Sequence, residues 1–325
     1  MIAISLLIFD EVVPSSITGV IDLISGANLY LAGIGQSPAF HLELVGEKKN
    51  PPPGFPLIGY HTYADAARPH LIIIPSFRVG NDSLLLDNVA GIEWIKQQRV
   101  KGTELASLCV GSYFLAEAGL LDGKEVTSHW AVVNDMQRRY PAIKMRSDQV
   151  ITDQDGIYTS GGAFSSLKLI LYLIEKFCGR EAAIWISKMY AIEMDRTSQA
   201  HFAVFTGQHQ HEDKEILRAQ QYVEQHYQDP ITMDNLSRLV NMGQRNFIRR
   251  FKAATNNTPF EYLQRVRIES AKRALENNDK DVASIMDDAG YRDQKAFRSI
   301  FRRLTGLSLQ EYKKKYARAS VNLSN

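Results

Sequence analysis

The sequence predicts two domains of different fold class, an α/β doubly wound N-terminal domain and an all-α C-terminal domain that contains two helix-turn-helix units. Three observations lead to this prediction. Up to about residue 180, short apolar runs alternate with helical patterns, which is typical of a sheet with helices on both faces. Beyond Glu181 the strand signals stop and most of the chain has a helical pattern. The length of 325 residues is sufficient for two domains that each bury a core.

The predicted strands of the N-terminal domain are short and continuously apolar. Residues 2–9 and 71–75 have this character, which fits parallel strands that are covered on both faces, and residues 104–108 are a third candidate. Strands that alternate with helices in this way indicate a doubly wound sheet. The helical patterns lie at residues 19–25, 87–98, 111–118 and 166–178.

Residues 232–254 have the pattern of one helix-turn-helix unit. Thr232 can cap a short helix, and the turn at 241–243 contains a glycine. A second helix follows over 244–254. Two short helices joined by such a turn are typical of this motif. The apolar residues expected in its core are Phe247, Ile248 and Phe251.

Residues 281–304 repeat this pattern. A short helix over 281–289 stops at Gly290, and Asp293 can cap a second helix over 294–304. A longer helix with a proline at its first position joins the two units. The apolar residues expected in the second core are Phe297, Ile300 and Phe301.

The C-terminal region is basic, whereas the rest of the chain is acidic. Residues 213–325 contain 21 Lys and Arg against 14 Asp and Glu, while residues 1–212 contain 17 against 22. A basic domain attached to an acidic body indicates binding to a polyanion. Polar and basic side chains at the start of the second helix of each unit are placed to contact double-stranded DNA. The predicted DNA-binding residues are Gln244, Arg245, Asn246, Arg249, Arg292, Gln294, Lys295, Arg298 and Arg302.

Several motifs in this region occur in register. They include Asn246-Phe-Ile-Arg-Arg-Phe251, Ala289-Gly-Tyr-Arg-Asp-Gln-Lys-Ala-Phe297 and Phe301-Arg-Arg-Leu-Thr-Gly306. Through them residues 213–317 resemble the AraC family of bacterial regulators. The resemblance implies that each unit lays one helix into the major groove, in adjacent turns on one face of the DNA. Several positions depart from the family pattern: Asn256 replaces a usual glycine, Leu309 a usual proline and Ser299 a frequent arginine, and Asp287-Asp288 place acidic residues just before the turn of the second unit.

A cysteine lies at a strand-to-helix turn of the N-terminal domain. Cys109 follows the predicted strand at 104–108, and Gly111 allows the backbone to pass closely. Such an elbow holds a nucleophile in an exposed, strained position, and the helix N-terminus favours the thiolate. His129 can return to the same end of the sheet and contact the sulfur. A core cysteine and a structural histidine are the alternative explanation for the same two residues.

The residues around this pair carry a second resemblance. Its motifs are Ser107-Leu-Cys-Val-Gly111, Leu115-Ala-Glu-Ala-Gly-Leu-Leu-Asp-Gly123, Thr127-Ser-His-Trp130 and Tyr158-Thr-Ser-Gly161. Residues 1–185 resemble the class I glutamine-amidotransferase-like superfamily in its ThiJ/PfpI branch, which implies a flavodoxin-like fold and a reactive pair of the matching Cys and His. Family enzymes commonly place a carboxylate beside the cysteine, but Ser16 occupies that position here. We therefore expect a vestigial or sensing pair rather than a catalytic one, in a ligand pocket lined by Ser16, Cys109, Val110 and His129.

Together the two resemblances indicate a cytoplasmic transcription regulator that binds double-stranded DNA and responds to a small molecule or a redox signal. It is expected to form a homodimer through its N-terminal domain and not to be an enzyme. Two alternatives stay open, a hydrolase or amidase that uses Cys109 and carries a DNA-binding domain, and a dimerisation scaffold with a vestigial pocket. The predicted domains are a sensor at 1–195, a connector at 196–212, a DNA-binding domain at 213–317 and a tail at 318–325.

The composition argues against several other classes of protein. Two cysteines, Cys109 and Cys178, do not make a disulfide-rich secreted scaffold, and Cys178 is expected in the core. The apolar start of the chain lacks a basic flank and a cleavage site, which favours a buried strand over a signal peptide. No apolar run reaches the roughly 18 residues of a membrane span. His209 and His211 have no second cluster at metal spacing, so neither a metal nor a cofactor is expected.

Overall fold

The chain divides into two compact units, Met1–Gln199 and Ala200–Asn325. The computed structural model describes residues 1–48, 58–80, 83–195, 197–277 and 281–317. The predicted tail at 318–325 and the first residue of the predicted connector lie outside the described residues. No helix among the described residues combines the length and the apolar character that crossing a membrane requires.

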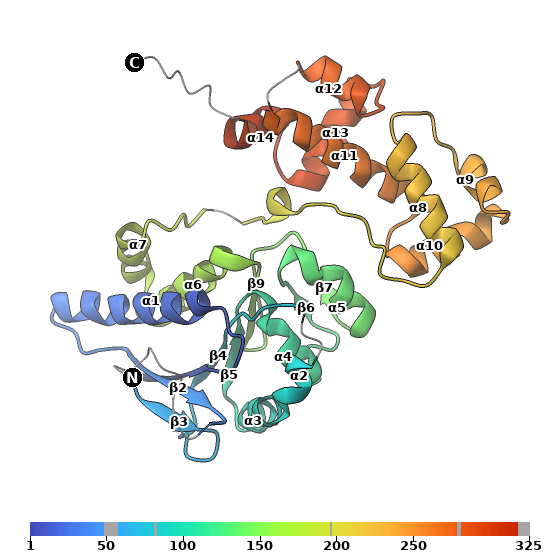
Figure 1. The fold of residues 1–325 in the computed structure, drawn as a ribbon. Helices are drawn as coiled ribbons and strands as arrows, with labels where there is room; N and C mark the ends of the chain where they lie inside the picture. The colour runs from blue at the N-terminus through green and yellow to red at the C-terminus, as the bar shows by residue number, and fades with distance from the viewer. Residues whose placement is uncertain (49–57, 81–82, 196, 278–280, 318–325) are drawn as a thin grey trace, which may run out of the picture. The chain divides into compact units, whose positions relative to one another are not determined.

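The first unit is built on a seven-stranded sheet with the order β3-β2-β1-β4-β5-β9-β8 (Figure 1). Neighbouring strands are parallel except β8 and β9, which form an antiparallel hairpin at one edge. The sheet confirms the predicted doubly wound α/β fold, and β1, β4 and β5 confirm the three predicted strands. The sequence pattern did not predict β2, β3, β8 or β9, nor the two short strands β6 and β7. The strands are β1 (Ile2–Leu7), β2 (Phe40–Gly46), β3 (Tyr60–Thr62), β4 (Leu71–Ile74), β5 (Glu104–Ser107), β8 (Ile151–Gln154) and β9 (Ile157–Ser160), and β6 (Glu125–Val126) pairs separately with β7 (Lys144–Met145).

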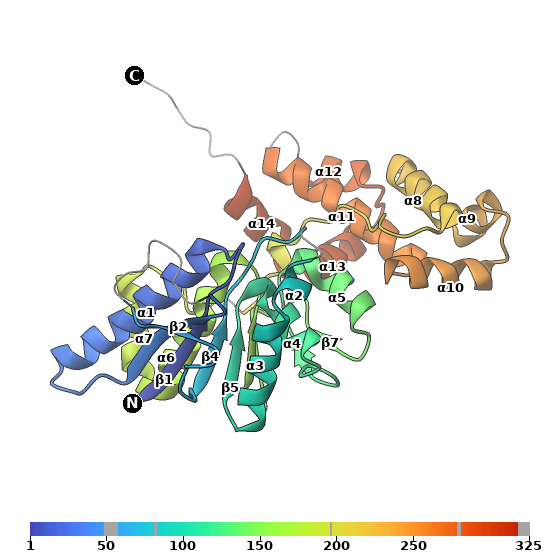
Figure 2. The same cartoon turned by 60° about the horizontal axis from the view of Figure 1, so that its bottom comes forward.

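Helices cover both faces of this sheet (Figure 2). One face carries α1, α6 and α7, and the other carries α3, α4 and α5, each over its own apolar core. The predicted helix at 87–98 is divided at Asn88, whose side-chain amide donates to the Leu84 carbonyl at 2.8 Å. The helices are α1 (Pro14–Gly33), α2 (Leu84–Asp87), α3 (Val89–Val100), α4 (Ser112–Glu117), α5 (Val133–Arg139), α6 (Leu167–Cys178) and α7 (Arg180–Met189).

The second unit is helical and contains two helix-turn-helix copies, which confirms the predicted all-α domain. The first copy is α9 (Met233–Leu239) with α10 (Gln244–Thr255), and the second is α12 (Val282–Asp288) with α13 (Gln294–Thr305). Before, between and after them lie α8 (Lys214–His226), α11 (Pro259–Asn277) and α14 (Leu309–Tyr316). Asp213, Thr232 and Asp293 accept backbone N–H groups at the starts of α8, α9 and α13, as N-cap side chains do.

Each copy has a separate apolar core, and the two cores are built alike. Two phenylalanines one helical turn apart are fully buried in each core, and a threonine follows them. In both copies the threonine hydroxyl donates to the carbonyl of the second phenylalanine at 2.8 Å. The predicted core residues Ile248 and Ile300 are only partly buried. The equivalent residues are Phe247, Phe251 and Thr255 in α10 and Phe297, Phe301 and Thr305 in α13.

Candidate functional site

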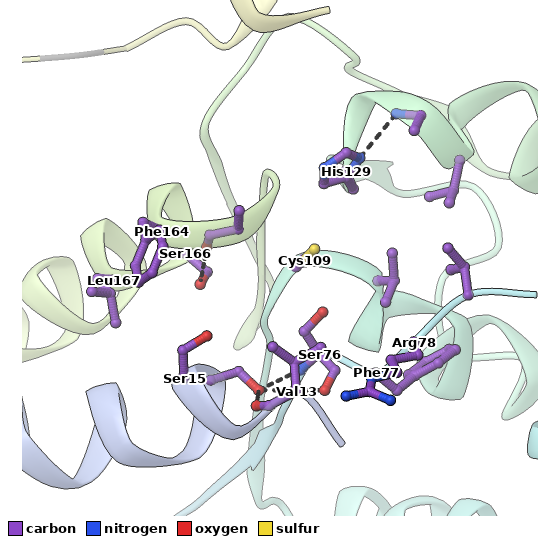
Figure 3. A pocket seen from close by; sticks show the side chains of 16 residues that line it. Val13, Ser15, Ser76, Phe77, Arg78, Cys109, His129, Phe164, Ser166 and Leu167 are labelled. Carbon is purple, nitrogen blue, oxygen red and sulfur yellow. Dashed lines mark hydrogen bonds between the residues drawn. The ribbon is translucent and has the colours of Figure 1, made fainter. Parts of the chain in front are cut away.

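A cavity of about 520 Å³ lies at the carboxyl end of the parallel strands of the first unit (Figure 3). Its walls come from the chain that follows β1, β4, β5, β6 and β9. Open α/β sheets bind ligands at this edge because loops from neighbouring strands converge there. The structure brings all four residues predicted for a ligand pocket to this cavity, namely Ser16, Cys109, Val110 and His129.

Several further residues line the cavity that the sequence did not single out. Phe77 and Arg78 follow β4, while Phe164 and Leu167 follow β9. Phe164 is 71% exposed, which is unusual for a large apolar side chain. Within the described part of the chain, the exposed Arg78 guanidinium makes no hydrogen bond or ion pair. The signal that could have located these residues is their position directly after a predicted strand or before a predicted helix.

Cys109 lies in the turn between β5 and a 3-10 helix, Cys109–Gly111, that precedes α4. Its φ of 56° is in the left-handed region that non-glycine residues rarely adopt, so the predicted backbone strain is present. The Cys109 N–H donates to the Ser160 hydroxyl at 3.3 Å, and the Cys109 carbonyl accepts from Ser128 Oγ at 3.0 Å. The predicted exposure of the thiol is wrong, because Cys109 is only 5% exposed and its sulfur faces the cavity (Figure 3).

Gly111 allows this turn to pass close to the end of β4. A Cβ at this position would lie 2.7 Å from the Ile74 carbonyl oxygen and 2.8 Å from that of Pro75. Both contacts are with backbone atoms, so relief would require β4 to move. We expect Gly111→Ala to lower the free energy of unfolding of the first unit by about 3 kcal/mol, measured by urea denaturation. Gly33→Ala in α1, where a Cβ meets nothing within 4 Å, is the matched control. Equal destabilisation by both variants would contradict this account.

His129 faces the cavity from the loop after β6. Its Nδ1 accepts the N–H of Ala131 at 3.1 Å, a bond that requires this nitrogen to be unprotonated. Burial lowers the pKa of His129 below its usual value of 6.5. The ring lies directly against Gly162, where a Cβ would come within 2.0 Å of Cδ2. Among the described residues no hydrogen bond joins His129 to Cys109, although both side chains line the same cavity.

The neutral state of His129 should make stability depend on pH. The pKa is lowered in the folded chain, so on acidification the unfolded chain takes up a proton first, near pH 6.5. Stability is therefore fully present above that pH and is lost as the pH falls toward the lower folded value. We expect the thermal midpoint of the wild type to fall more steeply below pH 6.5 than that of His129→Gln, which does not titrate. Parallel pH profiles of the two proteins would argue against a neutral, half-buried His129.

Ser16 has a structural role. Its hydroxyl donates to the Val13 carbonyl at 2.7 Å and accepts the Ser76 N–H at 3.1 Å, which ties the start of α1 to the chain after β4. The hydroxyl proton is thus already engaged. No Asp or Glu is among the described residues that line the cavity. The described lining therefore offers no carboxylate beside Cys109, the group through which a hydrolase would transfer protons.

The second cysteine and the predicted His-Gln-His cluster have structural surroundings. Cys178 ends α6 in a half-buried position rather than in the core as predicted, and burial raises the pKa of its thiol. His209 bonds to Glu224 at 2.9 Å, and His211 bonds to Gln220 at 2.8 Å. Within the described ranges no group of three or more His, Cys, Asp or Glu side chains is placed to hold a metal ion.

A second candidate site is formed by the exposed sides of α10 and α13. All nine predicted DNA-binding residues are exposed. In the second copy Arg292 precedes α13, and the other four residues lie on it. In the first copy four of them border one surface hollow together with Gly243, namely Gln244, Arg245, Asn246 and Arg249.

The basic side chains of the second unit fall into two groups. Some are engaged inside the unit, as in the pair of Arg250 with Asp213, which is joined by hydrogen bonds of 2.7 and 2.9 Å. Others, such as Lys295 and Arg298, make no ion pair with any residue that the structure describes. Their charges are therefore available to a polyanion.

Comparison with known proteins assigns a family to part of each unit. Residues 60–176 match the model of the DJ-1/PfpI family, and residues 236–315 match the model of a helix-turn-helix domain. The crystal structure of a candidate transcriptional regulator from Vibrio parahaemolyticus has a TM-score of 0.50 and 19% identity, covering 58% of this chain and 98% of that one. At that identity the likeness supports the fold alone.

Two relatives of different kinds share sequence with the chain. It is 28% identical over 220 residues to the HTH-type transcriptional regulator GbdR of Pseudomonas aeruginosa. The aligned residues cover 66% of this chain but only 59% of GbdR. It is 31% identical over 99 residues to the isonitrile hydratase of Pseudomonas putida, which covers 30% of this chain and 42% of the hydratase. The family matches confirm both resemblances: the chain combines a DJ-1/PfpI-type domain with an AraC-type helix-turn-helix domain.

Proposed function

We propose that the chain is a sequence-specific DNA-binding transcription regulator that responds to a small molecule or a redox signal in its N-terminal cavity. The observation that carries the proposal is the pair of helix-turn-helix copies, each with exposed polar and basic side chains at the start of its second helix. The same chain holds a cavity of about 520 Å³, a volume suited to a small ligand, in a separate unit. Because the two units belong to one chain, we propose that a ligand in the cavity controls DNA binding by the second unit.

DNA contact is assigned to both copies. Arginine and lysine side chains on α10 and α13 would neutralise phosphates and set the affinity. Arginine can also form a bidentate pair with guanine, and asparagine or glutamine with adenine, so that side chains at the helix starts read the sequence. Because α10 and α13 hold equivalent places in their copies, we propose that each enters the major groove in one of two successive turns.

The lining of the cavity supports an effector with an apolar body and one anionic group. Val13, Phe77 and Leu167 supply apolar surface, and Arg78, whose guanidinium has no partner among the described residues, can bind a carboxylate or a phosphate. The Cys109 thiol, carried on a strained backbone, faces the same space, which makes an oxidant the other signal to consider.

We further propose a homodimer that forms through the first unit. The exposed apolar side chains of Leu29, Trp185 and Met189 on α1 and α7 support this assignment. In the proposed regulator residues 1–195 sense the signal, 196–212 connect, and 213–317 bind DNA in the cytoplasm.

Selection of duplexes from a random pool tests this function. We expect enrichment of one sequence, and we expect Asn246→Ala and Gln294→Ala each to cost about 1–3 kcal/mol on it. The base pairs at which the two variants relax specificity should lie about 10 bp apart. The function would be refuted by a pool that shows no enrichment, and the two-groove arrangement by effects of both variants on the same base pairs.

A Cys109-dependent hydrolase that carries a DNA-binding domain is the second candidate function. The strained cysteine and the similarity to an isonitrile hydratase favour it, whereas the absence of a lining carboxylate among the described residues opposes it. Turnover of a panel of amides, esters and nitrile-like substrates by wild type and Cys109→Ser separates the two functions. Turnover that depends on Cys109 would support the enzyme, and its absence the regulator.

A further inference from the structure

Gln199 is buried behind the cavity and connects two of its walls. The residue is 1% exposed. Its Oε1 accepts the Gly162 N–H at 3.2 Å, and its Nε2 lies 2.9 Å from the Ser128 carbonyl. Ser128 directly precedes His129, and Gly162 directly precedes Ala163. His129 and Ala163 both line the cavity. One side-chain amide therefore holds the loop after β6 to the loop after β9.

The loop after β9 fits tightly between this amide and the cavity histidine. A Cβ at Gly161 would lie 2.6 Å from Gln199 Oε1, and a Cβ at Gly162 would lie 2.0 Å from His129 Cδ2. The Gln199 backbone is fixed as well, because its N–H donates to the Asp148 carbonyl at 2.9 Å. An occupant of the cavity that displaces His129 or this loop must therefore disturb the contacts of Gln199.

The chain enters the second unit immediately after Gln199. Residues Ala200–Phe202 form a 3-10 helix that packs against α13, the helix that carries the second set of predicted DNA-binding residues. The Ala203 carbonyl then accepts from Lys272 Nζ at 2.6 Å. Lys272 forms a buried ion pair with Glu269 on α11 at 2.9 Å. The residue anchored behind the cavity and the segment anchored on the second copy are thus consecutive in the chain.

We propose that Gln199 is the positioning residue through which occupancy of the cavity reaches the second helix-turn-helix copy. The inference rests on the proposed regulator function and names the path of its regulation. An occupant that shifts the walls of the cavity alters the hydrogen bonds of Gln199. Because residues 200–203 are held on α11 and α13, a displacement of Gln199 changes the restraint on those helices. A ligand that favours one arrangement of the amide then shifts the equilibrium between conformations of the DNA-binding surface.

Hydrogen exchange of the full chain, followed by mass spectrometry of peptides, tests the proposal without a known effector. Cys109→Met takes the place of an unknown ligand, because the longer methionine side chain partly fills the cavity, which has room for it. Gln199→Met removes the amide at similar volume. Gln98→Met is the matched control, because Gln98 is a buried glutamine of the same unit but lies on α3. Thermal unfolding of each variant first establishes that it folds.

We expect Gln199→Met to speed exchange about tenfold in the loops at 127–129 and 161–163 and in residues 200–205, the factor produced by losing about 1.4 kcal/mol of local hydrogen bonding. Gln98→Met should change neither region. Cys109→Met should alter exchange in both regions, but only in the cavity loops when combined with Gln199→Met. The proposal is overturned if Cys109→Met leaves residues 200–205 unchanged, or if its effect there survives the loss of Gln199. Binding of wild type to a selected duplex is measured in parallel, so that failure to bind DNA would count against the proposed function alone.

Discussion

Raising the salt concentration from about 50 to about 200 mM is expected to weaken binding of the full chain to its selected duplex by about a thousandfold or more. Each phosphate that a lysine or arginine neutralises releases a condensed counterion, so affinity falls as a steep power of the salt concentration. The measurement is a set of titrations monitored by fluorescence anisotropy at several salt concentrations. The exposed cations expected to contribute are Arg245, Arg249, Lys252, Arg292, Lys295, Arg298 and Arg302.

Two arginines of the same helix provide a matched comparison for this prediction. Arg298 makes no ion pair with the described residues, whereas Arg303 donates to the Gln264 side chain at 2.7 Å. Arg298→Ala should reduce the slope of log affinity against log salt by about one unit. Arg303→Ala should leave the slope unchanged because its guanidinium is engaged within the unit. Salt-independent binding, or equal slope changes in the two variants, would contradict the assignment of α13 to DNA contact.

The helical C-terminal unit could be predicted closely because its boundaries are encoded locally. Asp213, Thr232 and Asp293 cap helices with their own side chains, and Gly290 adopts a positive φ of 76° at the end of α12. Such signals act over three or four residues, so they can be recognised in the sequence without knowledge of the fold. The paired phenylalanines recur at the same places in both copies, and this periodicity marks the buried side of each helix.

Of the strands of this sheet that sequence reasoning missed, β2, β3 and β8 lie toward its edges, whereas β9 is buried but reads Ile-Tyr-Thr-Ser rather than as a continuous apolar run. The central strands β1 and β4 are covered on both faces and read as apolar runs, while β5 follows this pattern only in part because it begins with Glu104 and ends with Ser107. By contrast, β2 carries the exposed His41, β3 has three half-buried residues, and β8 contains Asp153. A strand with one neighbour, or with one face toward water, does not need an apolar run. The pattern used for central strands therefore could not find it.

The cavity residues were only partly predictable for a different reason. Cys109 and His129 belong to motifs of their own, but Arg78 and Phe164 reach the cavity through the path of their loops. That path includes a positive φ of 48° at Ala163. An alanine gives no sign of such a backbone conformation in the sequence. The bridging role of Gln199 was not predicted because its partners lie far away in the sequence. A buried amide that joins distant loops has no local pattern.

Phe301→Ala is expected to lower the free energy of unfolding of the second helix-turn-helix copy by about 3–5 kcal/mol. The side chain has no exposed surface and packs on Phe297 and Tyr312, with ring centroids 6.1 and 5.4 Å away. The two cores share no buried residue, so the loss should fall on one copy. Hydrogen exchange of the full chain should show faster exchange in α12, α13 and α14 but not in α9 and α10.

The equivalent substitution in the first copy makes this a symmetric test of how the two copies contribute to DNA binding. Phe251→Ala removes a side chain that is also fully buried and packs on Phe247 and Tyr262 with centroids 5.6 and 5.3 Å away. If each copy occupies its own major groove, Phe301→Ala should erase one block of the footprint and Phe251→Ala the other, about one helical turn apart. Ser299→Ala, at an exposed position of α13, controls for substitution in that helix and should stay within about 0.5 kcal/mol of wild type. The shared helix α11 is an element through which damage could spread, because Leu263 packs in the first core and Ile268 in the second. Loss of the whole footprint in both variants would therefore mean that α11 couples the copies into one cooperative unit, which would refute independent grooves.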